Sequence, residues 1–165
     1  SLDNRTDAVN AHALRLSGGK EFMACTDEEP LPNGWLGTTV ENQAAANERI
    51  PLLLQTPAAV RWLSVEPMLG AIDLIQALDF ALPNYDVPAV CPSAHLHWVV
   101  IGCESGRNRR PCKIEWVESL VQQCKLAGIP CFLKQLEIDG KVTTDVARFP
   151  AHLRIREYPN QQEVK

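Results

Sequence analysis

Carboxylate side chains follow three apolar stretches of the chain, each at the point where the stretch stops. Glu41 stands after WLGTTV, Glu66 after WLSV, and Glu104 after VVIGC. A carboxylate placed beside a buried strand is costly unless a cation or a ligand pairs with it. Ionised carboxylates accept hydrogen bonds from amines and hydroxyls. These endings therefore predict a site for a polar ligand.

A fourth apolar stretch, CFL, is followed by Lys134 and Gln135, which adds a cation and an amide to the set. Two interpretations are open. Lys134 neutralises Glu66 or Glu104 in a purely structural network, or these side chains form a binding site. We favour the binding site, because such a cluster is expected where ligands bind. The candidate ligand-binding residues are Thr39, Glu41, Asn42, Ser64, Glu66, Glu104, Ser105, Lys134 and Gln135. The pattern assigns no catalytic role to any of them.

Hydrophobic patterning predicts alternating strands and helices around these residues. Strands are expected at 35–40, 59–67, 96–103 and 131–136, a hairpin at 136–143 and one late strand at 152–158. Asn42 can cap a helix that Pro51 restarts or kinks, a second helix is expected within 69–78, and a third runs from about Ile114 to Gly128. The Asp139-Gly140 pair is typical of a two-residue hairpin turn.

Short apolar strands separated by helices indicate parallel pairing, with the carboxyl ends of the strands at one face. The expected fold is α/β, a four-stranded, mostly parallel β/α sheet resembling a partial (β/α) barrel with a C-terminal hairpin. We expect an irregular N-terminal segment over 1–32, the β/α domain over 33–136, and the hairpin and tail over 137–165.

Composition argues against several classes of function. The 165-residue chain has a net charge of −4, so nucleic acid is not indicated as a partner, and the basic stretch RNRRPCK (107–113) is interpreted as solvated surface. The sequence has no apolar run of membrane-spanning length and no leader pattern, so we expect a cytoplasmic protein without membrane contact. None of the six cysteines forms a CxxC pair, no metal site is expected, and no phosphate loop or nucleophile elbow is present.

Five blocks resemble a largely uncharacterised, radical-SAM-like family of phage and bacterial proteins. They are NGWLGTTVENQ, PAAVRWLSVEPMLG, LHWVVIGCESG, EWVESLVQQCKLAGIPCFLKQ and the late DG, which together span about residues 33–142. The resemblance is to the C-terminal half of such proteins. It implies S-adenosylmethionine and a [4Fe–4S] cluster in full-length relatives, whose CxxxCxxC motif is absent from this sequence. We therefore expect no cofactor in this chain. Cys103 and Leu136 differ from the glycine and tryptophan common in relatives.

Together these observations predict the ligand-binding half of a radical-SAM-like, phage-type protein, without radical chemistry of its own. Two alternatives are a stand-alone accessory protein that binds a small molecule and a hydrolase that uses Glu66 and Glu104. Whether the chain is an enzyme is left open. Because a four-stranded sheet leaves exposed edges, we expect a homodimer, a complementary cluster-bearing half, or closure by the N-terminal segment and the region 136–158.

Overall fold

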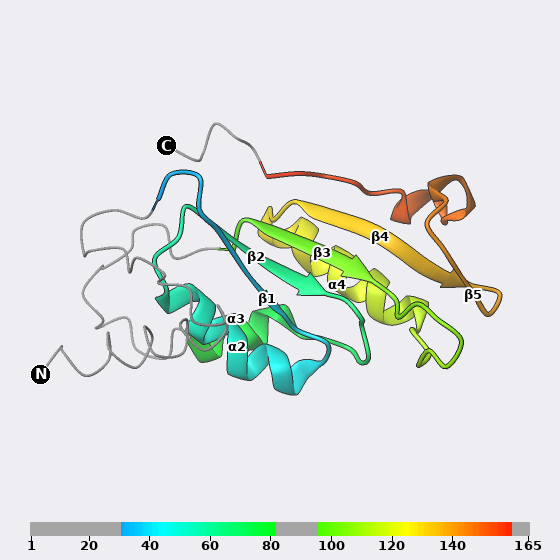
Figure 1. Cartoon of the computed structure of the whole chain (residues 1–165), viewed down its shortest axis with the longest axis horizontal. Helices are drawn as coiled ribbons and strands as arrows, with labels where there is room; N and C mark the ends of the chain where they lie inside the picture. The colour runs from blue at the N-terminus through cyan, green and yellow to red at the C-terminus, as the bar shows by residue number, and fades with distance from the viewer. Residues whose placement is uncertain (1–30, 82–95, 160–165) are drawn as a thin grey trace, which may run out of the picture.

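A five-stranded sheet is the centre of the computed structural model, which describes residues 31–81 and 96–159 (Figure 1). The first four strands pair in parallel and in sequential order, and the fifth runs antiparallel to the fourth. The strands are β1 (Trp35–Thr39), β2 (Val60–Val65), β3 (Trp98–Gly102), β4 (Cys131–Ile138) and β5 (Lys141–Thr143). The predicted α/β class, parallel sheet and C-terminal hairpin are confirmed. Most of the expected N-terminal segment 1–32 lies outside the described residues.

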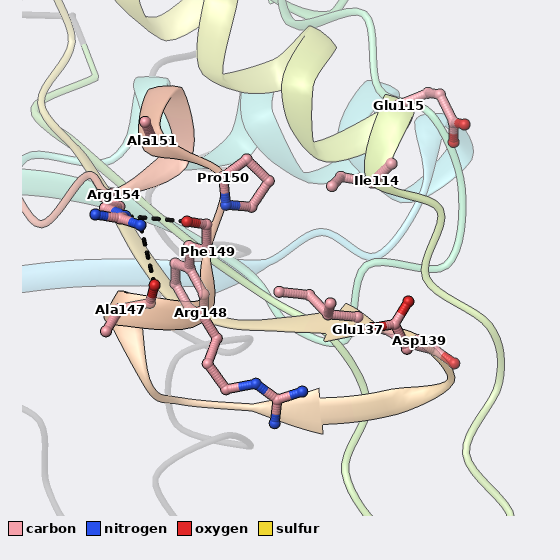
Figure 2. Close-up of a pocket in the computed structure, with 11 residues that line it drawn as sticks. Ile114, Glu115, Glu137, Asp139, Ala147, Arg148, Phe149, Pro150, Ala151 and Arg154 are labelled. Atoms are coloured by element: carbon pink, nitrogen blue, oxygen red, sulfur yellow. Dashed lines mark hydrogen bonds between the residues drawn. The ribbon is translucent and has the colours of Figure 1, made fainter.

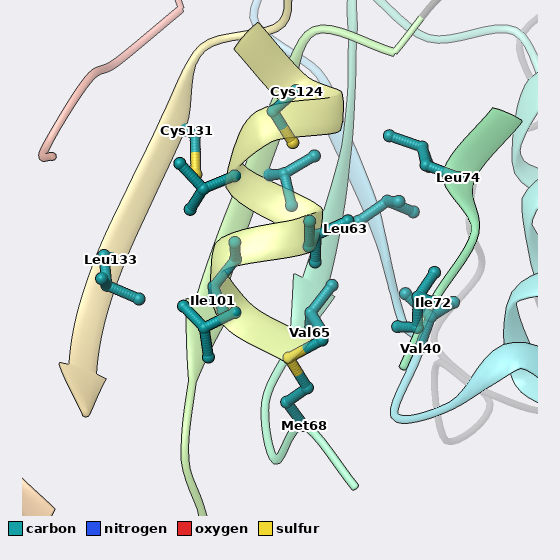
Figure 3. Close-up of a cluster of buried hydrophobic side chains, with 14 of the residues drawn as sticks. Val40, Leu63, Val65, Met68, Ile72, Leu74, Ile101, Cys124, Cys131 and Leu133 are labelled. Carbon is teal, nitrogen blue, oxygen red and sulfur yellow. The ribbon is translucent and has the colours of Figure 1, made fainter. Parts of the chain in front are cut away.

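Three helices, α2 (Gln43–Gln55), α3 (Leu74–Ala81) and α4 (Ile114–Ala127), pack against one face of the sheet. Side chains at every second strand position, such as Leu63, Val65 and Ile101, point into this layer and are almost fully buried. Figure 3 shows them packed with residues of α4 and with Leu74 at the start of α3. One hydrophobic core therefore fills the space between the sheet and its helices.

Two helices differ in part from expectation. Of the two alternatives for Pro51, a restart and a kink, the restart is wrong: α2 continues through Pro51, because Ile50, Leu53 and Leu54 bury their side chains in the core on both sides of it. Helix α3 begins at Leu74 rather than near residue 69, because the Asp73 carboxylate accepts the backbone N–H of Gln76 and caps it there.

The region after β4 covers the outer edge of that strand. Strand β5 pairs with its last residues, and further along the chain the Leu133 N–H donates to the Ile155 carbonyl and the Glu157 N–H to the Cys131 carbonyl, both at 2.9 Å. The expected late strand at 152–158 is reduced to a single bridge between Phe132 and Arg156. Closure of this edge by the region 136–158 is confirmed. Strand β1 forms the other edge, where no strand among residues 31–81 and 96–159 pairs with its outer side.

Within these same ranges, no helix has the length and apolar character needed to cross a bilayer.

Candidate functional site

The sheet face opposite the three helices, here called the open face, carries the strand residues that alternate with the core. Along β2 these are Trp62 and Ser64, followed by Glu66, and all three side chains are partly exposed. No helix of the described part of the chain covers this face (Figure 1). Aromatic residues occupy its amino-terminal end, and charged residues occupy its carboxyl-terminal end.

Glu66 is the centre of a hydrogen-bonded group at the carboxyl end, the Glu66 cluster (Glu66, Gly102, Lys134, Gln135). The Lys134 ammonium donates to both carboxylate oxygens at 2.9 and 3.0 Å, and the Gln135 amide donates to Oε1 at 3.1 Å. Gly102 lies beside it, since a Cβ on that residue would stand 3.1 Å from the Glu66 carboxyl carbon. Two side chains of β4, through three hydrogen bonds, therefore hold a carboxylate that follows β2.

A β-bulge explains how two consecutive residues of β4 reach the same carboxylate. Ile101 pairs with Leu133, but the next residue, Gly102, pairs with Gln135, so Lys134 is an extra residue on β4. Without the bulge, the strand period of two would place Lys134 and Gln135 on opposite faces. The bulge turns both side chains toward the open face.

Glu104 lies one residue beyond Cys103, on the loop after β3, and is bound by Arg110. The Arg110 Nε and Nη2 donate to its two oxygens at 2.9 and 2.6 Å, and the Arg110 backbone N–H adds a bond of 2.7 Å. These bonds lower the pKa of Glu104 to about 2. Glu104 is therefore ionised at neutral pH, where it cannot serve as a general acid.

Backbone hydrogen bonds hold the strand ends together. The Leu69 N–H donates to the Glu41 carbonyl at 2.8 Å, and the Met68 N–H donates to the Gly102 carbonyl at 2.9 Å. The Gln135 amide, besides its bond to Glu66, donates to the Cys103 carbonyl beside Glu104. Hydrogen bonds therefore join the segment after β2 to the ends of β1 and β3. Through Gln135, β4 is joined to Glu66 after β2 and to Cys103 after β3. The four strand ends meet at one edge of the sheet.

The remaining predicted residues are placed less centrally. Glu41 forms an ion pair with Arg49 at 3.0 Å, and the carbonyl of Thr39 accepts a second bond from the same guanidinium at 2.7 Å. Asn42 caps α2, where its side chain accepts the Ala45 N–H at 3.0 Å. Asn42 therefore has a structural use.

The last two predicted residues are Ser64, on β2, and Ser105, on the loop after β3. Ser64 is partly exposed and pairs in register with Thr39 on one side and Val100 on the other. Ser105 is exposed on the loop after β3. The structure therefore groups Glu66, Lys134 and Gln135 directly, and Ser64 of β2 lies two residues before Glu66.

Sequence reasoning missed Arg110, which lies in the basic stretch interpreted as solvated surface. The available signal was its position six residues after Glu104, within a short polar loop that contains Gly106. It also missed the aromatic row (Trp35, Trp62, Trp98, Phe132, Tyr158) at the other end of the open face. Trp98 lies at its centre, with its ring 5.8 Å from Trp62, 6.1 Å from Phe132 and 5.6 Å from Tyr158.

A hollow of about 610 Å³ lies away from the predicted residues, between the start of α4 and the β4–β5 hairpin (Figure 2). Its lining includes Ile114, Glu137, Asp139 and Arg154. The Arg154 guanidinium donates to the carbonyls of Phe149 and Ala147, both at 3.0 Å, and so holds the short turns after β5 in place. None of the predicted site residues lines this hollow, and the site at the strand ends is instead a part of the sheet surface.

The described cysteines do not fit an iron–sulfur cluster. Cys103, Cys112, Cys124 and Cys131 are buried, and they are neighbours in two separate pairs, Cys103 with Cys112 and Cys124 with Cys131. A cluster of the implied kind needs three thiolates from one motif, converging on the same iron–sulfur unit. In the described ranges, no three His, Cys, Asp or Glu side chains are grouped to hold a metal ion.

The fold is that of an α/β protein with alternating strands and helices. Its first four strands are parallel and sequential, its helices pack on one face of the sheet, and its polar strand ends meet at one edge. A family model described as protein of unknown function (DUF5131) matches residues 5–158. The chain belongs to this family. No curated protein and no solved structure matches the chain significantly.

Proposed function

We propose that this protein binds a small polar molecule on the open face, at the carboxyl ends of its parallel strands. The observation that carries the proposal is the Glu66 cluster, a carboxylate held by Lys134 and Gln135 on a face that no described helix covers. The Glu66 side chain is 23 % exposed, so its carboxylate is accessible to a ligand while its neighbours hold it in place. A functional group held by several neighbours is preorganised for binding.

The location supports a ligand site more than a purely structural pair. In parallel β/α folds, ligands bind at the carboxyl ends of the strands, because loops from several strands meet there. The Glu66 cluster combines the end of β2 with Gly102 of β3 and two residues of β4. A surface ion pair between two strands contributes little stability by itself. The convergence of three strands on one carboxylate is therefore better explained by a binding role.

The proposal extends to the context of the protein: it is the ligand-binding half of a radical-SAM-like protein of phage type, located in the cytoplasm. The support is the resemblance of five sequence blocks and the sequential strand order, which is the order found within a (β/α) barrel. Because the sequence lacks the CxxxCxxC motif and the described cysteines do not fit a cluster, the proposal assigns no radical chemistry to this chain on its own. Under the hydrolase alternative, Glu104 can act only as the base or nucleophile, since Arg110 keeps it ionised, and Glu66 would have to supply the acid.

We also propose that a partner contacts the open face and the outer edge of β1, with which no strand of the described residues pairs. The partner is a second copy of the chain or a complementary half that carries the cluster, since unpaired strand edges recruit further strands. Light scattering coupled to gel filtration distinguishes these cases, because a homodimer has twice the 18.3 kDa mass of the chain. A strictly monomeric protein would argue against the homodimer.

Equilibrium dialysis of the whole chain against a bacterial metabolite extract, read by mass spectrometry, tests ligand binding. We expect the native protein to enrich one or a few polar metabolites, and Glu66→Gln to lose that enrichment, because the amide cannot hold Lys134 in the same way. Glu118→Gln is the matched control, since Glu118 lies on α4, away from the open face, and pairs with His152 at 2.7 Å. The proposal fails if the native protein retains nothing, or if Glu66→Gln retains as much as the control.

A further inference from the structure

We propose that the ligand of this site is a small organic anion with a flat apolar body. Its anionic group, a phosphate or a carboxylate, is bound by Lys134 and Arg110, and its body extends over the open face toward the aromatic row. This inference rests on the proposed function and names the chemical class of its ligand.

A count of hydrogen-bond donors and acceptors supports the anionic group. Glu66 and Glu104 each accept three bonds from the described residues, out of roughly four lone-pair positions per carboxylate. Among residues 31–81 and 96–159, the Lys134 ammonium donates only to Glu66, and Arg110 uses two of its roughly five guanidinium N–H groups. The unused capacity at this end of the sheet consists mainly of donors, and donors recognise an anion.

Both cations also lie farther out than the carboxylates that hold them. The Lys134 side chain is 52 % exposed against 23 % for Glu66, and the Arg110 side chain is 58 % exposed against 26 % for Glu104. Each carboxylate therefore binds its cation on the less exposed side, and the other side of the cation faces solvent. An incoming anion meets the cations first.

The basic loop 107–113 adds positive charge next to these pairs. It contains three arginines and one lysine, of which Arg109 and Arg110 are paired with carboxylates, while Arg107 is exposed. A local excess of one sign attracts ligands of the opposite sign even when the whole protein carries a net charge of −4. The stretch first interpreted as solvated surface thus favours an anion at this edge.

The flat body follows from the floor of the open face. Residues two apart on a strand share a face and stand about 7 Å from each other. Ser64 of β2 lies between Trp62 and Glu66, and its register partner on β3 is Val100; neither carries a large side chain. Phe132 pairs with Val100 on the other side. A planar group attached to an anion at Lys134 can therefore lie over this floor and contact Phe132 and Trp62, as aromatic rings prefer.

The test is a titration of the isotopically labelled whole chain, followed by the NMR signals of Gly102 and the Gln135 side-chain amide. The probes are phenyl phosphate, benzoate, inorganic phosphate, phenol and benzylammonium. We expect phenyl phosphate or benzoate to bind at least about tenfold more tightly than phosphate and phenol, because only these probes contact both parts of the site. The stronger of the two identifies the anionic group as phosphate or carboxylate.

Variants assign the contacts. Lys134→Met and Arg110→Met are each expected to weaken the better aryl anion about tenfold, whereas Phe132→Leu weakens it and leaves inorganic phosphate unchanged. Lys125→Met, at the exposed end of α4, is the matched control and should have no effect. Circular dichroism confirms that each variant is folded.

Three results would overturn the inference. They are binding of benzylammonium in preference to the anions, equal binding of phenyl phosphate and inorganic phosphate, and aryl-anion binding that survives both cation substitutions. The first would leave the proposed function intact, because it would show a polar ligand accepted by the carboxylates. Failure of the dialysis experiment with the native protein would instead remove the proposed function itself.

Discussion

Replacement of Gly37 by alanine should destabilise the protein, because the indole of Trp62 occupies the space that a side chain at residue 37 would need. Gly37 and Trp62 are register partners on β1 and β2. A Cβ on Gly37 would lie 2.3 Å from Cε2 and 2.4 Å from Nε1 of that indole. Ordinary carbon contacts begin at about 3.5 Å, so the ring must retreat by about 1 Å. It cannot retreat freely, since it packs against Trp98.

The magnitude follows from two opposing effects. Overpacking of this kind costs about 1–3 kcal/mol. Alanine also restricts the unfolded chain more than glycine does, which favours folding by about 0.4–1 kcal/mol where the new side chain fits. The clash is the larger effect, so we expect Gly37→Ala to lower the free energy of unfolding by about 1–2 kcal/mol. The corresponding fall in melting temperature is about 2–8 °C for a chain of this size.

Urea denaturation followed by circular dichroism measures this change. Gly70→Ala is the control, because its nearest neighbour, the Asn42 Cβ, would stand 3.5 Å from the new methyl group, an ordinary contact. Its stability should be unchanged or slightly raised. Combining Gly37→Ala with Trp62→Leu should cost less than the sum of the two single changes, since the smaller side chain removes the clash. A Gly37→Ala protein as stable as the native one would refute the reasoning.

Three further predictions concern the Glu104 pair, the core and a helix cap. Because the pKa of Glu104 is lowered from 4.5 to about 2 in the folded protein, its bonds to Arg110 stabilise the fold above about pH 4.5. Arg110→Met should therefore be less stable than the native protein at pH 7 in urea titrations, and this difference should shrink as the pH falls from 4.5 to 2; a difference independent of pH would contradict it. Leu120→Ala should lower the free energy of unfolding by about 2–5 kcal/mol, since Leu120 is 0 % exposed, whereas Leu126→Ala, at 74 % exposure, should change it by less than about 0.5 kcal/mol in the same denaturation assay. Asn42→Ala removes the cap of α2 and should cost about 1 kcal/mol, and thermal denaturation equal to that of the native protein would show that the cap is dispensable.

The elements of the fold were predictable because local signals and burial agree along most of the chain. Helix α4 illustrates this: Val117, Leu120, Val121 and Cys124 repeat at helical spacing and are all buried, and Gly128 ends the helix with φ near 67°. Helix α2 was less predictable, because Pro51 is a local stop signal. Packing of the helix against the core outweighs that signal, and packing is a property of the assembled layers.

The candidate site was predictable only in part. Strand endings identified Glu66 and Lys134, and the structure joins them in an ion pair of 2.9 Å. Gln135 was predicted at the site beside Lys134, but a regular strand would carry these two residues on opposite faces, and the bulge on β4 is what brings both to Glu66. Arg110 was set aside, because a basic stretch without a known partner is indistinguishable from a solvated loop.

Residue types and their order along the chain determined the β/α alternation, the parallel pairing and the edge of the sheet where polar residues gather. These features depend on hydrophobic periodicity, which is local and survives in the sequence as a readable pattern. Tertiary structure decided which cation neutralises which carboxylate, where the bulge falls and that the aromatic row lies on the open face. Each of these depends on register between strands that are distant in sequence, and register is set when the sheet forms and its helices bury one face.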